Sequence, residues 1–228
     1  MEDLNKKDLE KVFSNVRESY RLLYEYQKRV LDLVKFIGNQ LNYSYSGGWP
    51  IFSEPCPKRG KGSLDNWAWD WLNMYAYGFH FGENKEGIKF EIRIYSDTGF
   101  YDNTTDKKIS VDKFNSGEDS KTKLVLIVSR EEWNINKMLE NFNSRTNKYK
   151  LLKELKNLQW SQSSKALTLR DLNSQWIEFC KNSSNTICAK SYDLSSFLNE
   201  ETITEQLEDF GEYCFETCGI DIGYSSKA

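Results

Sequence analysis

An apolar repeat that runs from Leu9 to Leu41 constrains the fold of this chain more than any other feature. Apolar residues recur at alternating steps of four and three residues, and Gln27 is the polar exception among them. This spacing is typical of the seam of an α-helix that packs at a shallow angle against another helix. The seam positions are Leu9, Phe13, Val16, Tyr20, Leu23, Gln27, Val30, Val34, Ile37 and Leu41. The sequence therefore predicts one long helix within residues 1–45, roughly 50 Å in length at 1.5 Å per residue.

Two interpretations of this helix stay open from its pattern. Additional apolar residues widen the stripe beyond a two-helix seam, which predicts that the C-terminal half is covered on several sides. These residues are Leu22, Tyr26, Leu31, Leu33 and Phe36. The favoured interpretation is the spine of an intramolecular helical layer. The alternative is a dimerisation helix that joins two copies of the chain through residues 9–41, with Gln27 fixing the register.

A long loop rich in glycine and proline is expected to follow the helix, over residues 46–66. It contains all three prolines of the chain, and Lys58, Arg59 and Lys61 lie close together near its end. Backbone amides beside glycines and cations can hold an anion, but proline occupies the positions where a P-loop needs glycine. A solvated linker is the favoured interpretation, and an anion or nucleic-acid contact is the alternative.

Three segments after this loop have the pattern of β-strands, which predicts a small antiparallel sheet over residues 67–129. The expected strands are 73–82, 87–97 and 121–131. In the second of them Ile88 and its alternate neighbours are apolar, while the intervening positions are polar, as in a strand with one buried face.

The remainder of the chain, 130–228, is predicted to form a helical layer. Thr202 and Glu205 have the spacing of a capping box, and Gly219 is expected to end the helix that follows. A short strand is expected within residues 185–193. The inward residues of the last helix are expected to be Ile203, Leu207, Phe210 and Cys214. The whole chain, 1–228, is thus predicted to be a single α+β domain.

Aromatic residues alternate through the stretch 67–81. From Tyr75 to Phe81 they are expected to form the buried face of a strand. Three tryptophans within five residues exceed what a core usually needs, so they are expected to form a binding rim beside the basic loop. The candidate binding residues are therefore Trp67, Trp69, Trp71, Lys58, Arg59 and Lys61.

A polar combination in the predicted sheet resembles the Asp…Glu-x-Lys arrangement of metal-dependent nucleases. Asp70, Glu91 and Arg93 have the right order, and Glu91 and Arg93 would share one face of a strand next to a Mg²⁺ ion. Arginine replaces the lysine, however, and Glu-x-Arg on an alternating strand is also a common pattern of cross-strand salt bridges. His80 is the one histidine of the chain and is expected to be structural. No catalytic residue, metal ligand or cofactor is assigned.

Composition and charge narrow the expected function. The net charge of −3 disfavours a surface devoted to nucleic acid. Nucleic acid therefore remains the less favoured partner. Five cysteines without a regular framework, a charged N-terminus and no long apolar window predict a cytoplasmic protein with reduced thiols and no membrane segment. The leading hypothesis is a non-enzymatic protein of accessory, inhibitor or immunity type that acts through a protein–protein interface. A nuclease-like enzyme that uses Asp70, Glu91 and Arg93 is the alternative.

Overall fold

The structure is a computed structural model that describes residues 5–50, 75–99, 111, 114–130, 167–168 and 187–224. The chain divides into two compact units, Met1–Phe36 and Ile37–Ala228. The division falls inside the long N-terminal helix. The sheet, the C-terminal helix and the last turn of the N-terminal helix therefore belong to one unit.

The predicted long helix is present as α1, Lys6–Gln40. Its start is capped by Asn5, whose side-chain oxygen accepts hydrogen bonds from the backbone N–H groups of Lys7 and Asp8. At its end Asn42 adopts a left-handed conformation, with φ of 57°. The N–H of Asn42 bonds to the carbonyl of Asn39, and the N–H of Tyr43 reaches back to Gly38. This pattern is a Schellman motif, which satisfies carbonyls that the end of a helix otherwise leaves open.

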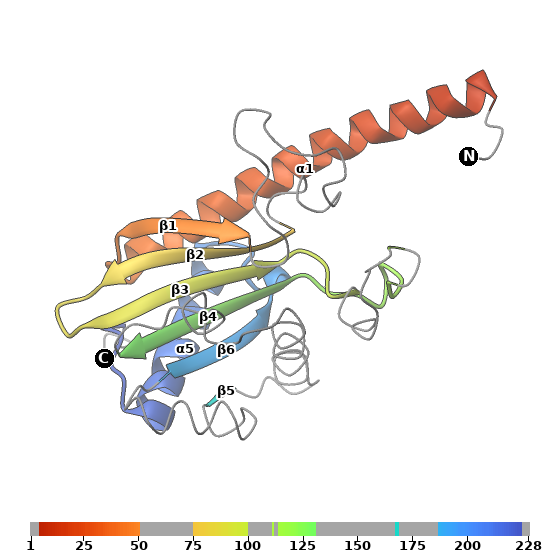
Figure 1. Cartoon of the computed structure of the whole chain (residues 1–228). Coiled ribbons are helices and arrows are strands. Elements are labelled where there is room, and N and C mark those ends of the chain that lie inside the picture. The colour runs from red at the N-terminus through yellow and green to blue at the C-terminus, as the bar shows by residue number, and fades with distance from the viewer. Residues whose placement is uncertain are drawn as a thin grey trace, which may run out of the picture. The chain divides into compact units, whose positions relative to one another are not determined.

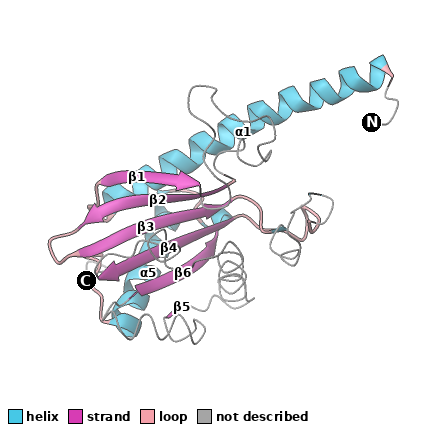
Figure 2. Ribbon diagram, viewed as in Figure 1, coloured by secondary structure: helices cyan, strands magenta, loops and turns pink. Residues whose placement is uncertain are grey.

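The sheet is antiparallel throughout and has the order β1-β2-β3-β4-β6-β5 (Figures 1 and 2). Its strands are β1 (Tyr45–Pro50), β2 (Ala76–Glu83), β3 (Ile88–Tyr95), β4 (Lys123–Arg130), β5 (Leu167–Thr168) and β6 (Ile187–Asp193). The three strands expected at its centre are confirmed as β2, β3 and β4. Together with the helices, this sheet confirms the predicted α+β class.

The sheet extends beyond the predicted limits of 67–129 at both edges. Strand β1 occupies the start of the predicted loop 46–66 and pairs with β2, with a register shift between Tyr45 and Gly47. The short, glycine-containing sequence of β1 carries no clear alternation, and its pairing depends on the free edge of β2. At the other edge β6 confirms the short strand expected within 185–193 and places it against β4.

The C-terminal helix α5, Glu200–Cys218, follows the 3₁₀ turn η6, Leu194–Ser196. Gly219 ends α5 in a left-handed conformation, as predicted. The predicted capping box of Thr202 with Glu205 is wrong, because the box is formed three residues earlier by Asn199 and Thr202. The side chain of Asn199 accepts from the N–H of Thr202, and this reciprocal pairing fixes the true start of the helix. Among the described residues no helix is long and apolar enough to cross a membrane.

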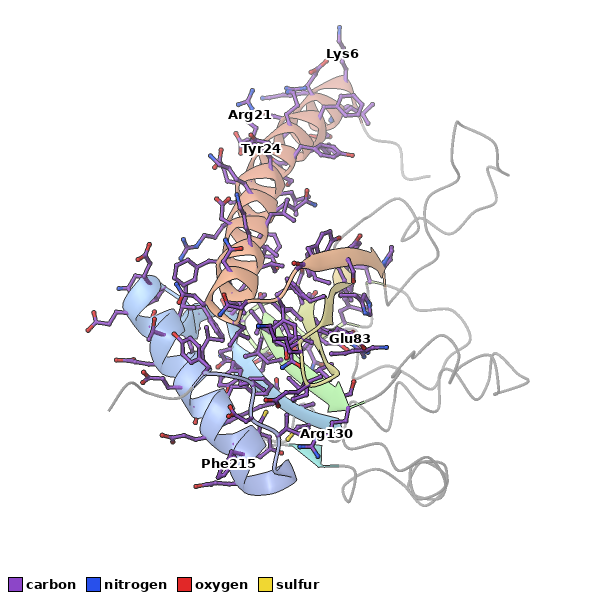
Figure 3. The ribbon with its side chains drawn as sticks, turned by 90° about the vertical axis from the view of Figure 1, so that its left-hand side faces the viewer. Lys6, Arg21, Tyr24, Glu83, Arg130 and Phe215 are labelled. Carbon is purple, nitrogen blue, oxygen red and sulfur yellow. The ribbon has the colours of Figure 1, made fainter. Side chains whose placement is uncertain are left out.

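One face of the sheet packs against α5, as Figure 3 shows from the side. Ile203, Leu207, Phe210 and Cys214 of α5 are all buried, which confirms the predicted inward set. Asp209 of α5 forms an ion pair of 2.5 Å with Lys190 and accepts a hydrogen bond of 2.7 Å from Tyr192. Both partners project from the same face of β6, so these contacts fix the helix over that face.

The last turn of α1 contributes to the same core. Ile37 and Leu41 are buried, and the ring of Phe81 lies against the backbone of Gly38. Phe81 also contacts Phe90, with ring centroids 5.2 Å apart, and Tyr43 contacts Phe90 at 5.3 Å. Phe79 and Phe81 are buried, which confirms the core assignment for this part of the aromatic strand.

Candidate functional site

The first half of α1 leaves its apolar seam exposed. Five successive seam positions each expose between 37% and 66% of their surface: Leu9, Phe13, Val16, Tyr20 and Leu23. Val12 and Tyr24, which flank the seam, are exposed as well. We call these seven residues the apolar face of α1. Figure 3 labels Tyr24 on α1, next to Arg21.

The second half of the same seam is buried. Val30, Val34, Ile37 and Leu41 each expose 4% or less of their surface. The predicted cover of the C-terminal half of α1 is thereby confirmed for the seam, although Leu22 and Leu31, which were expected to widen the covered stripe, are exposed. A single periodic pattern thus contains one buried stretch and one exposed stretch. Scattered apolar side chains are normal on a protein surface, whereas large continuous apolar patches are typical of interaction sites.

Charged side chains of both signs border the apolar face of α1. Glu10 and Arg17 each follow a seam residue directly, so they lie beside the stripe rather than opposite it. Glu18 and Glu25 lie on the far side of the helix. Such a border provides no concentrated positive charge for a phosphate backbone or an anionic membrane.

A second candidate is a buried polar cluster on the other face of the sheet. Glu91 and Arg93 point to the same side of β3, and a carboxylate oxygen of Glu91 accepts a hydrogen bond from Nε of Arg93. His80 lies directly across from Glu91 on β2, with Nδ1 3.4 Å from the second carboxylate oxygen. Glu91 exposes 5% of its surface and Arg93 3%. The predicted strand with one buried face is therefore wrong, because both faces of β3 are withdrawn from water.

The charges of this cluster compensate one another. Burial by itself lowers the pKa of Arg93, but the negative charge of Glu91 and hydrogen bonds with Glu91 and Tyr95 raise it above its usual value. Burial lowers the pKa of His80, and the nearby Arg93 lowers it further, while Glu91 opposes both effects. His80 is accordingly neutral near pH 7, and the cluster is a buried ion pair bordered by a neutral imidazole.

This geometry bears on the nuclease alternative. The structure brings Glu91 and Arg93 together as predicted, but the carboxylate of Glu91 is engaged by Arg93 and faces His80. Asp70 lies outside the described residues. In the described ranges, no group of three or more histidine, cysteine, aspartate or glutamate side chains is placed to hold a metal ion. The expected cross-strand salt bridge of Glu-x-Arg is wrong in its partner, because Glu91 and Arg93 pair with each other on β3 and the group across from Glu91 on β2 is His80.

The predicted tryptophan and basic-loop site is not tested by the structure. Trp67, Trp69, Trp71, Lys58, Arg59 and Lys61 lie outside the described residues. The site residues on α1 were not assigned from the sequence, although their pattern was recognised. The available signal was the width of the stripe, which is narrow before Leu22 and wide after it, as expected for a helix that is enclosed only at its C-terminal end.

The described residues define an α+β protein with a long N-terminal helix, an open antiparallel sheet and a C-terminal helix. A model of the PM0109 family matches residues 6–219, and the chain belongs to this family. The family name states no activity. No curated protein and no solved structure matches the chain.

Proposed function

We propose that this protein is a non-enzymatic binding protein of accessory, inhibitor or immunity type that acts through a protein–protein interface on the apolar face of α1. The observation that carries the proposal is the exposure of five successive seam positions from Leu9 to Leu23. The same spacing is buried between Val30 and Leu41, so the pattern is one that this chain uses for packing. A second helix is the partner that such a seam accommodates.

The chemistry of the stripe favours a protein over other partners. Phe13, Tyr20 and Tyr24 are large aromatic side chains, which are enriched in interface hot spots. The two charged residues that border the seam, Glu10 and Arg17, are of opposite sign, whereas nucleic acid and anionic lipid select clustered lysine and arginine. We place the interaction in the cytoplasm, in agreement with the buried thiol of Cys214.

The proposal is tested by introducing a charge into the middle of the apolar face. Val16→Glu in the full chain is compared with the control Glu18→Gln, which changes the far side of the helix. Association is measured by cross-linking followed by native mass spectrometry, with the chain purified from its host. We expect Val16→Glu to abolish association and Glu18→Gln to preserve it, with unchanged circular dichroism for both variants. Association that survives Val16→Glu would contradict the proposal.

A further inference from the structure

We propose that the partner on the apolar face of α1 is a second copy of this chain, bound antiparallel so that Glu10 of each helix meets Arg17 of the other. This inference rests on the proposed function, because it names the occupant of the same surface. It is carried by three observations: the distribution of charge beside the seam, the order of large and small seam residues, and the exposed apolar area.

The charge distribution selects the orientation. A helical seam has two borders, one on each side. Between Leu9 and Gln27 the positions of the first border are Glu10, Arg17 and Tyr24. The three on the other side are Val12, Ser19 and Tyr26. Parallel helices place the first kind of border against the second, where Glu10 and Arg17 would meet uncharged residues. Antiparallel helices place the first kind against itself, so that opposite charges one heptad apart come together.

The two-fold symmetry of the pair doubles this contact. In the register that joins Glu10 to Arg17, each helix supplies both members, which gives two ion pairs related by the symmetry axis. Only one register achieves this, because shifting one helix by a heptad brings Arg17 against Arg17 of the second copy. The charges thus specify both the orientation and the register of the assembly.

The seam residues fit the same register. With Glu10 opposite Arg17, Leu9 packs against Tyr20 of the second copy and Phe13 packs against Val16. Each layer then combines one aromatic ring with one aliphatic side chain, so the spacing between the helices stays even. A parallel pair in register would instead alternate layers of two rings with layers of two aliphatic side chains.

The exposed apolar area contributes to such a contact. Phe13 exposes 50% of its surface and Tyr20 exposes 66%, which amounts to roughly 100 Å² for each aromatic side chain. A standard interface takes about 800 Å² from each partner. The two rings therefore supply about a quarter of that area. Leu9, Val12 and Val16 add to it, as do the aliphatic stems of the bordering charged residues.

A charge-exchange experiment on the full chain tests the inference. Sedimentation velocity over a range of concentrations gives the dimer dissociation constant for the natural chain, Glu10→Arg, Arg17→Glu and the double variant. Each single variant replaces two attractive pairs with two repulsive ones, and we expect it to raise the constant about tenfold. The double variant restores opposite charges and should return the constant to near the natural value. Glu18→Arg, on the far side of the helix, serves as the control and should leave the constant unchanged.

Rescue by the double variant cannot arise within one helix. Glu10 and Arg17 are seven residues apart, whereas side chains in a helix interact at separations of three and four residues. Circular dichroism of each variant verifies that α1 is retained. High ionic strength should also reduce the difference between the single and double variants, because the pairs lie at the edge of the interface.

The other outcomes overturn the inference. A chain that is monomeric at every concentration excludes the second copy as partner. A dimer whose dissociation constant is the same in both single variants as in the natural chain excludes the antiparallel register. If the chain is monomeric while Val16→Glu still abolishes association with a different protein, the inference fails and the proposed function stands. If Val16→Glu changes neither association, both fail.

Discussion

The sheet and the first half of α1 invert the usual distribution of residues. In the sheet a charged pair, Glu91 and Arg93, is almost completely buried, whereas in the helix the apolar rings of Phe13 and Tyr20 expose half or more of their surface. The buried charges are compensated by each other and by their neighbours. The exposed rings have no such compensation among the described residues of the helix. From this difference we expect the sheet to carry most of the stability of the protein and the helix to carry the proposed interaction.

The largest expected difference in the free energy of unfolding comes from replacing an arginine with methionine, once in the sheet and once in the exposed half of α1. Arg93→Met leaves the carboxylate of Glu91 buried without its guanidinium partner and should lower the free energy of unfolding by about 3–5 kcal/mol. Arg17→Met removes an exposed charge and should change it by less than about 0.5 kcal/mol. Denaturant unfolding at a concentration where the chain is monomeric measures both.

A double variant sharpens this prediction. Arg93→Met together with Glu91→Met removes both charges from the sheet, so no unpaired buried charge remains. We expect the double variant to be more stable than Arg93→Met alone. A double variant at least as unstable as the single one would indicate that packing, rather than charge compensation, gives this pair its role.

A leucine in each region provides a second comparison. Leu207 of α5 is fully buried, and Leu207→Ala should cost about 2–5 kcal/mol through lost burial and the remaining cavity. Leu23→Ala in the exposed seam should cost less than about 0.5 kcal/mol in the monomer. Denaturant unfolding of the two variants measures both losses of stability. Equal losses for the two variants would mean that the apolar face of α1 is covered within the monomer, which would contradict the proposed function.

Two alanine substitutions, at Gly38 and at Ser19, compare the buried and the exposed stretch of α1. Gly38 lies against the ring of Phe81, and a β-carbon there would overlap the ring. Gly38→Ala should therefore lose about 1–2 kcal/mol of stability, although alanine is the better helix former by about 1 kcal/mol. Ser19→Ala on the exposed stretch should leave stability unchanged or raise it by a few tenths of a kcal/mol. Thermal melting of the two variants provides the comparison, and a stabilising Gly38→Ala would contradict the close packing at this end.

The smallest expected effect is a pH dependence that belongs to the sheet. Burial keeps the pKa of His80 below 6.5 in the folded protein, whereas the unfolded chain takes up the proton near pH 6.5. As the pH falls below 6.5, the unfolded state binds a proton that the folded state does not, so stability decreases. Above this range His80 contributes no pH dependence. His80→Gln should remove this component.

The measurement is the difference in unfolding free energy between the natural chain and His80→Gln from pH 8 to pH 5. We expect this difference to be constant at the alkaline end. As the pH falls, the natural chain should lose unfolding free energy relative to His80→Gln. Curves that stay parallel over the whole range would show that the folded and unfolded pKa values of His80 are equal. His80 is the one histidine of the chain, so no other imidazole contributes.

Local patterns determined much of this fold from the sequence. The four-three repeat from Leu9 to Leu41 predicted α1, and alternation predicted β2, β3 and β4. The inward residues of α5 and its end at Gly219 followed from helical spacing and from the tolerance of glycine for positive φ. Each of these features depends on residues that are close together in the chain. Strand β1 was missed because its pairing depends on the edge of β2, which lies far away in the sequence.

Only the tertiary structure decided which apolar and polar residues are exposed. Phe13 and Val16 belong to the same four-three repeat as Val30 and Val34, so the sequence by itself could not say that the first pair is exposed and the second is buried. Likewise, Glu91 and Arg93 occupy positions that alternation assigns to water, and the burial of that face was not visible in β3 alone. Periodicity specifies that a face is apolar or polar, but burial is a property of what packs on it. The chain therefore encodes its helices and strands locally, while the exposure of one stretch of a repeat and the burial of another depend on what packs against each stretch.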